Sequence, residues 1–197
     1  MPLNTPNILT LLRIALIPVF VLVYFLPNTW ANMESAGFFL LAALTDWLDG
    51  YLARKLNQSS AFGAFLDPVA DKLMVAAALI LIVANPHLRP ALMSAPLFSV
   101  VVLIIIGREI AVSALREWMA EVGKRKSVAV SYVGKFKTAV QMVAILLLLY
   151  ERPILGMPAF RIGEILLYLA AGLTLWSMGV YLKAAWPELI KADAGEP

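Results

Sequence analysis

Four aspartates lie inside two neighbouring apolar segments of this 197-residue chain. Asp46 and Asp49 are three residues apart, and Asp67 and Asp71 are four apart. On an α-helix these spacings place each pair on one face, roughly 40–60° apart around the axis. A carboxylate in the middle of a membrane helix costs about 2.5–3.5 kcal/mol. Four of them therefore indicate a functional site rather than packing.

The chemistry that this acid cluster predicts is the binding of a divalent cation. Carboxylates gathered without partners repel one another, and a metal ion relieves that repulsion. The chain has no cysteine and a single histidine, His87. Its metal ligands must then be oxygen atoms, which favours Mg²⁺, Mn²⁺ or Ca²⁺. The alternative, structural ion pairs with Arg54 and Lys72, would leave the acids in excess.

The elements that position these acids are expected to be membrane-spanning helices. Hydrophobic residues make up 61% of the chain and charged residues 15%, and the mean hydropathy is +0.83. This composition excludes a disordered chain, a coiled coil, a disulfide scaffold and a free nucleic-acid-binding domain. It predicts an all-α polytopic membrane protein in one domain, 1–197. Six stretches approach the length of a span, namely Ile8–Leu26, Gly37–Leu56, Phe62–Ala84, Pro90–Leu115, Phe136–Tyr150 and Ile162–Ala184.

The distribution of lysine and arginine predicts that both termini are cytoplasmic, because basic residues concentrate on that side of a membrane. The expected inner side carries Arg54, Lys55, Arg116, Lys124, Arg125, Lys126, Lys135, Lys137, Lys183 and Lys191, whereas the outer side carries Arg89, Arg152 and Arg161. The polar turn Asn57–Ser60 would fold the second span against the third. All four aspartates would then meet near the cytoplasmic surface. The net charge of +3 fits a chain in an anionic phospholipid bilayer.

A longer motif contains the four aspartates. It reads Asp46-x-x-Asp49-Gly50-x-x-Ala53-Arg54, followed by Gly63, Asp67 and Asp71. This pattern resembles the signature of the CDP-alcohol phosphatidyltransferase family at every fixed position. Further similar segments are Pro6–Arg13, Thr45–Gly50, Phe62–Lys72, Gly107–Ile110 and Gly134–Thr138, so that the resemblance covers most of the chain and thins after Tyr150.

The resemblance implies a six-helix enzyme of a bacterial inner membrane, active as a homodimer. Such an enzyme moves the phosphatidyl group of CDP-diacylglycerol to an alcohol and releases CMP. By resemblance, two Mg²⁺ or Mn²⁺ ions would be held by Asp46, Asp49, Asp67 and Asp71, with Asp71 also the catalytic base. The CDP-diacylglycerol site would include Gly50, Ala53, Arg54 and Gly63, and on weaker grounds Asn7, Thr10 and Ser60.

The segments outside the signature imply, by the same resemblance, that the acceptor is sn-glycerol 3-phosphate. A phosphorylated acceptor needs cations away from the metal, and Arg108, Lys135 and Lys137 can supply them. Arg108 could instead form an ion pair with Glu109, and the two lysines could be ordinary flanking charges. Arg13 is expected to pair with the acids.

Two other functions remain open at this point. The signature alone also fits family members that use serine, inositol phosphate or phosphatidylglycerol as acceptor. Intramembrane acids are in addition a mark of cation-coupled transporters. A transporter is disfavoured because the acids gather at one face, no inverted repeat is visible, and six spans are few.

Overall fold

The computed structural model describes residues 5–27, 30–55, 61–124 and 132–193, and within these ranges it leaves some side chains undescribed. The described chain is all-α, as predicted. Its α-helices are α1 (Thr5–Tyr24), α2 (Ala31–Lys55), α3 (Ala61–Ala84), α4 (Ala95–Glu121), α5 (Tyr132–Tyr150) and α6 (Ala159–Asp193), and a short 3-10 helix, η1 (Arg89–Ala91), precedes α4.

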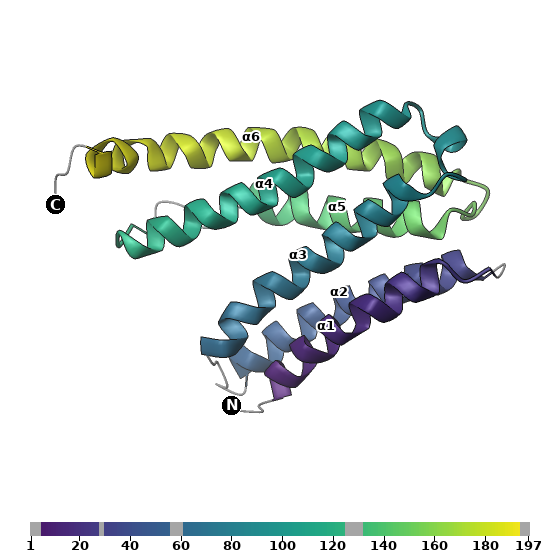
Figure 1. The fold of residues 1–197 in the computed structure, drawn as a ribbon, viewed down its shortest axis with the longest axis horizontal. Helices are drawn as coiled ribbons and strands as arrows, with labels where there is room; N and C mark the ends of the chain where they lie inside the picture. The colour runs from purple at the N-terminus through teal and green to yellow at the C-terminus, as the bar shows by residue number, and fades with distance from the viewer. Residues whose placement is uncertain (1–4, 28–29, 56–60, 125–131, 194–197) are drawn as a thin grey trace.

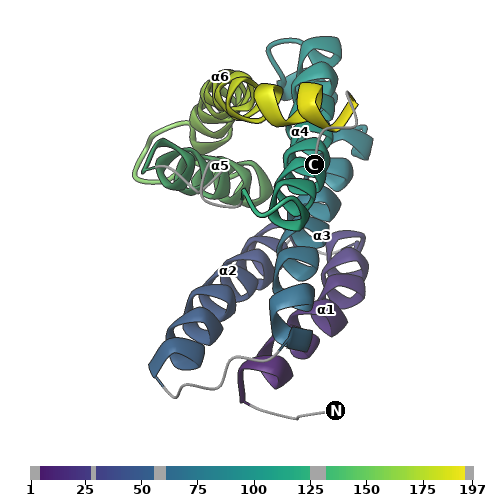
Figure 2. The same cartoon turned by 90° about the vertical axis from the view of Figure 1, so that its left-hand side faces the viewer.

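The helices form two groups of three that meet along α3 (Figures 1 and 2). One group packs α1 against α2 and α3, and the other packs α6 against α4 and α5. Contacts of α3 with α4 and α5, and of α2 with α5, join the two groups. Figure 1 shows that α1 and α3 begin toward the same end of the molecule at which α2, α4 and α6 finish. The acids therefore lie toward the end where the chain begins and finishes.

The limits of several helices differ from those of the predicted spans. The second helix, α2, begins at Ala31 and not at Gly37, and α5 begins at Tyr132 and not at Phe136. The fourth was expected over Pro90–Leu115, but Pro90 lies in η1, and α4 begins after Ser94, whose Oγ accepts a hydrogen bond from the Leu97 amide at 3.4 Å. Gly123 ends α4 with a φ of 74°, which lets the Lys124 amide reach the Met119 carbonyl at 2.8 Å.

The sixth helix was expected over Ile162–Ala184, yet α6 continues to Asp193 through Pro187. Beyond Ala184 the chain carries the charged residues Glu188, Lys191 and Asp193, but it stays rich in residues that favour helix, such as alanine, leucine, glutamate and lysine. The apolar part of this helix continues to Ile190, so the predicted span stops too early.

Large apolar side chains point outward along much of the surface, as expected for a bundle surrounded by lipid. Leu22 and Leu103 are each 70% exposed, whereas Phe20, Phe98 and Ile105 are fully buried between helices. Among the described residues, three helical segments are long and apolar enough to cross a membrane, namely Asn7–Tyr24, Ala95–Glu121 and Ala159–Ile190. The number of spans and their orientation stay predictions.

A buried carboxylate holds the α3–α4 connection onto α6. Glu164 is fully buried and accepts hydrogen bonds from the Met93 amide at 2.8 Å, the Tyr168 hydroxyl at 2.7 Å and Arg161 Nη1 at 2.9 Å. A buried charge is tolerated only when it is paired and hydrogen-bonded, as this one is. The contact fixes the end of the bundle opposite to the aspartates.

We expect Gly163→Ala to lower the free energy of unfolding by about 1–3 kcal/mol, because the added methyl group would overpack the contact between α5 and α6. A Cβ at Gly163 would lie 2.9 Å from the Ala144 carbonyl oxygen and 3.0 Å from Leu147 Cβ on the adjacent α5. Gly172→Ala is the matched control on α6, because nothing lies within 4 Å of its added Cβ. Unfolding in detergent measures both, and equal stability of the two variants would contradict the close packing of α5 and α6.

Candidate active site

The acids on α2 and α3 are contacted by polar residues of α1. Arg13 Nη1 donates to Asp46 Oδ1 at 2.6 Å, and Thr10 Oγ1 donates to Asp67 Oδ1 at 2.6 Å. Arg13 and Thr10 are 1% and 0% exposed, whereas the Asp46 side chain is 45% exposed. The predicted pairing of Arg13 with the acids is thus confirmed, and α1 joins the two acid-bearing helices.

Asp71 lies one helical turn along α3 from Asp67. It lines a cavity together with Lys72 and with Glu109 of α4. Asp71 is therefore placed between Asp67 and the polar groups of the second helix group.

Several predicted site residues lie outside what the structure describes. Ser60 precedes the described part of α3, and the side chains of Asp49, Gly50, Ala53, Arg54 and Lys135 are undescribed, although their backbones belong to α2 and α5. Asn7 and Gly63 are described and are buried near the beginnings of α1 and α3. The roles assigned to all of these residues by resemblance stay predictions.

The donor set fits a hard divalent cation, although the described residues do not enclose one. Asp46, Asp67 and Asp71 offer only oxygen atoms, and Arg13 already supplies a positive charge to Asp46. Among the residues whose side chains are described, no three acids or histidines are grouped closely enough to hold a metal ion. Asp49, the fourth predicted ligand, is not among them.

A second polar region lies between α3, α4, α5 and α6 and is strongly basic. It is a cavity of about 130 Å³, here called the basic cavity, and its lining includes Lys72, Arg108, Arg116, Lys137 and Glu109. The described lining residues thus contribute four cations and one carboxylate. Such an excess of positive charge in a partly enclosed space attracts an anion.

Glu109 organises two of these cations. Its Oε1 accepts from Arg108 Nη1 at 3.0 Å and from Lys137 Nζ at 2.8 Å. Arg108 also donates from Nη2 to Ser177 Oγ at 2.8 Å and lies 5.9 Å from the centre of the Tyr181 ring. The ion pair that the sequence left as an alternative for Arg108 is therefore present, and the same side chain also lines the basic cavity.

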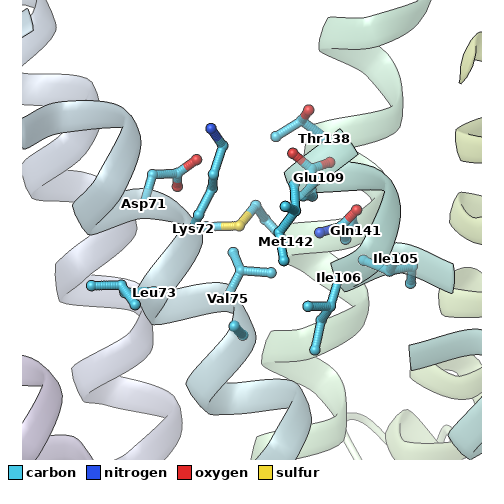
Figure 3. A pocket seen from close by; sticks show the side chains of 12 residues that line it. Asp71, Lys72, Leu73, Val75, Ile105, Ile106, Glu109, Thr138, Gln141 and Met142 are labelled. Atoms are coloured by element: carbon cyan, nitrogen blue, oxygen red, sulfur yellow. The ribbon is translucent and has the colours of Figure 1, made fainter. Parts of the chain in front are cut away.

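A larger cavity of about 180 Å³, here called the mixed cavity, separates α3 from α4 and α5 (Figure 3). Asp71, Lys72, Glu109 and Thr138 lie at one end of it, and Leu73, Val75 and Ile106 lie at the other. Lys72, Glu109 and Thr138 line both cavities. The two cavities therefore adjoin, with Asp71 on the wall of the mixed one.

Sequence reasoning missed three residues of this region. Lys72 was considered as a partner of the aspartates, but its amine contacts Ser113 of α4. The sequence indicates Arg116 only as a flanking charge, and it does not single out Gln141. Gln141 lies four residues after Lys137 on α5, and this polar pair on one face of a largely apolar helix could have indicated it.

Comparison with known proteins places the chain among enzymes of one kind. Residues 3–176 match the family model for CDP-alcohol phosphatidyltransferases. A CDP-diacylglycerol–glycerol-3-phosphate 3-phosphatidyltransferase of Shigella flexneri is 52% identical over 96% of this chain and 99% of its own length. Proteins of the same name from Pectobacterium atrosepticum and Yersinia enterocolitica are each 51% identical over 97% of this chain and their full lengths.

Proposed function

Because this chain belongs to the CDP-alcohol phosphatidyltransferase family, we propose that it transfers the phosphatidyl group of CDP-diacylglycerol to sn-glycerol 3-phosphate. The products are phosphatidylglycerophosphate and CMP. The relatives that carry this activity in their names cover nearly the whole chain at 51–52% identity, including both groups of helices.

The observation that carries the choice of acceptor is the basic cavity. An acceptor with its own phosphate needs a cationic pocket beside the reacting centre, whereas serine does not. Arg108, Lys137 and Lys72 line such a pocket, and it adjoins the cavity that contains Asp71. A guanidinium and an ammonium held by the same Glu109 oxygen are preorganised for one phosphate group.

In the reaction a hydroxyl oxygen of glycerol 3-phosphate attacks the phosphorus of the phosphatidyl group. A new P–O bond forms, the pyrophosphate bond to CMP breaks, and CMP leaves with the bonding electrons. Asp71 accepts the hydroxyl proton on its carboxylate. Arg108 and Lys137 hold the acceptor phosphate, and Lys135 belongs to the same proposed set. This arrangement brings the hydroxyl and the base together.

The donor side of the site is proposed from the α1–α3 end of the molecule. Asp46, Asp49, Asp67 and Asp71 would hold Mg²⁺ or Mn²⁺, two ions in all, and when bound these ions neutralise the charge that develops on the pyrophosphate. Asn7, Thr10, Gly50, Ala53, Arg54, Ser60 and Gly63 would contact CDP-diacylglycerol. Thr10 and Arg13 orient the acids through their contacts with Asp67 and Asp46.

The test of this function is CMP release by the purified protein in detergent with CDP-diacylglycerol and one acceptor at a time. We expect glycerol 3-phosphate to support turnover, and serine, inositol phosphate and phosphatidylglycerol to support little. Robust turnover with serine and none with glycerol 3-phosphate would refute the proposed acceptor.

Removal of divalent metal is expected to abolish CMP release, because only oxygen ligands surround the proposed donor site and the pyrophosphate needs charge neutralisation. The measurement is the same assay in excess EDTA, followed by addition of Mg²⁺ or Mn²⁺ above the chelator concentration. Restored activity is the expected result. Full activity in EDTA would rule out the metal requirement.

We propose that the acid-bearing end faces the cytoplasm of a bacterial inner membrane. The lysine and arginine asymmetry of the sequence supports this orientation. Because the chain has no cysteine, single cysteines can report it. Leu155→Cys, at a position 94% exposed after α5, should react with an impermeant maleimide in intact cells. Lys124→Cys, after α4, should react only after permeabilisation. The reverse pattern would invert the proposed topology.

A homodimer is a further part of the proposal and rests on the family resemblance. Cross-linking in the native membrane measures it. The chain has a mass of 21.6 kDa, and the expected cross-linked product has twice that mass.

A further inference from the structure

Gln141 is a buried polar side chain with an unmet hydrogen-bonding group. It is 3% exposed in the middle of α5, and among the described residues its Oε1 has no hydrogen-bond partner. A buried amide oxygen without a donor is costly, and native structures seldom retain one without a reason. Gln141 is therefore expected to meet a donor that the described residues do not provide.

The position of Gln141 indicates where that donor comes from. Gln141 lines the mixed cavity together with Asp71, Glu109 and Thr138 (Figure 3). It follows Lys137 by four residues, so the two side chains lie on the same face of α5. Lys137 lines the basic cavity. Gln141 thus lines the same cavity as the proposed base and follows a residue of the proposed phosphate site by one helical turn.

The chemistry of the two substrates indicates which of them supplies this hydrogen-bond donor. CDP-diacylglycerol carries donors in its ribose hydroxyls and its cytosine amine, but its proposed contacts lie at the α1–α3 end and not on α5. The ester oxygens of its diacylglycerol part only accept hydrogen bonds. Glycerol 3-phosphate has two hydroxyls, one of which attacks and gives its proton to Asp71. The remaining hydroxyl, on the central carbon, is an O–H donor within a few bonds of both the phosphate and the attacking oxygen.

We infer that Gln141 is a specificity-determining residue that accepts a hydrogen bond from the central hydroxyl of the acceptor. The inference rests on the proposed function, which supplies the identity of the acceptor. The acceptor then has three points of contact. Arg108 and Lys137 hold its phosphate, Asp71 takes the proton of its attacking hydroxyl, and Gln141 binds its central hydroxyl. The enzyme then selects a phosphorylated glycerol over a phosphorylated alcohol of the same length that lacks the central hydroxyl.

The test combines a substitution that removes the amide of Gln141 with a substrate analogue that lacks the central hydroxyl. Wild-type protein and Gln141→Met are assayed for CMP release with sn-glycerol 3-phosphate and with 3-hydroxypropyl phosphate. The latter keeps the phosphate and the terminal hydroxyl but has no central one. Methionine preserves length and burial while removing the amide. Val143→Leu, at a lipid-facing position of α5 that is 48% exposed, is the matched control.

We expect the wild-type kcat/KM to favour glycerol 3-phosphate by about tenfold or more, since the analogue leaves the buried amide unpaired. Gln141→Met should reduce this ratio to about one by losing activity toward glycerol 3-phosphate, with the KM for CDP-diacylglycerol unchanged. Val143→Leu should keep the wild-type ratio.

Three results would overturn the inference, and they differ from one another. A Gln141→Met protein that keeps the wild-type ratio would show that Gln141 does not read the hydroxyl. Equal use of both acceptors by the wild-type protein would show the same even if the variant failed to fold. A wild-type protein that turns over neither acceptor would refute the proposed function itself, and this inference with it.

Discussion

Replacing Asp71 by asparagine is expected to lower kcat for CMP release by about 10²–10⁴-fold, the usual contribution of a positioned general base. The KM for glycerol 3-phosphate should change little, because Arg108 of α4 and Lys137 of α5 hold the phosphate in the proposed site. Asparagine has nearly the same shape as aspartate but cannot take up the hydroxyl proton. The effect should therefore fall on the chemical step and not on binding of the acceptor.

The steady-state kinetics of Asp71→Asn should be compared with those of Glu121→Gln. Glu121 is exposed at the end of α4 and carries the same chemical change away from both cavities. The control is expected to behave as wild type. An Asp71→Asn protein that unfolds at the wild-type temperature and retains most of its kcat would exclude Asp71 as the base, and the proton would have to go elsewhere.

The acid-bearing helices could be predicted from sequence because the signals there are local. Apolar stretches of about 20 residues define the helices, and the spacing of Asp46 with Asp49, and of Asp67 with Asp71, fixes a shared face within each helix. The partner of Arg13 was also predictable in kind, because a buried guanidinium requires an acid. The structure supplies the particular acid, Asp46, at 2.6 Å.

The surroundings of Arg108 could not be predicted, because they depend on contacts between distant parts of the chain. Ser177 and Tyr181, on α6, bind and cover its guanidinium, and no periodicity links α6 to α4 in the sequence. The role of Gln141 could not be predicted from the sequence for a related reason. A single glutamine in an apolar helix is uninformative until the structure shows that its oxygen faces a cavity and has no donor among the described residues.

Helix ends were predictable only where a local signal marks them. The Ser94 cap marks the beginning of α4, and the positive φ of Gly123 marks its end. The predicted limits of this span follow hydropathy and therefore differ from both. Hydropathy reports which part of a helix lies in lipid, and a helix such as α6 can extend beyond that part.

The second large effect is expected at Arg108. Removing its side chain with Arg108→Ala should lower kcat/KM for glycerol 3-phosphate by about ten- to a hundredfold, mainly through a higher KM. This range corresponds to about 1.5–3 kcal/mol, the contribution of one hydrogen bond to a charged group. The KM for CDP-diacylglycerol should stay near its wild-type value, because Arg108 lies in the basic cavity rather than beside Asp46 and Asp67.

Arg108→Lys separates a phosphate contact from a structural ion pair. A lysine retains the positive charge beside Glu109 but cannot give the two parallel hydrogen bonds of a guanidinium, so it should recover only part of the lost affinity. Ser177→Ala removes the contact that anchors Arg108 to α6 at 2.8 Å and should cause a smaller rise in the same KM.

The outcome at Arg108 also decides how the basic cavity is used. If Arg108→Ala is folded, as judged by its unfolding temperature in detergent, and has an unchanged KM for glycerol 3-phosphate, Arg108 serves only its ion pair with Glu109. The acceptor phosphate must then be bound by Lys137 and Lys135 without it. A KM that rises in Arg108→Ala, falls partway in Arg108→Lys and moves slightly in Ser177→Ala is expected only if the guanidinium contacts the phosphate and α6 holds it in position.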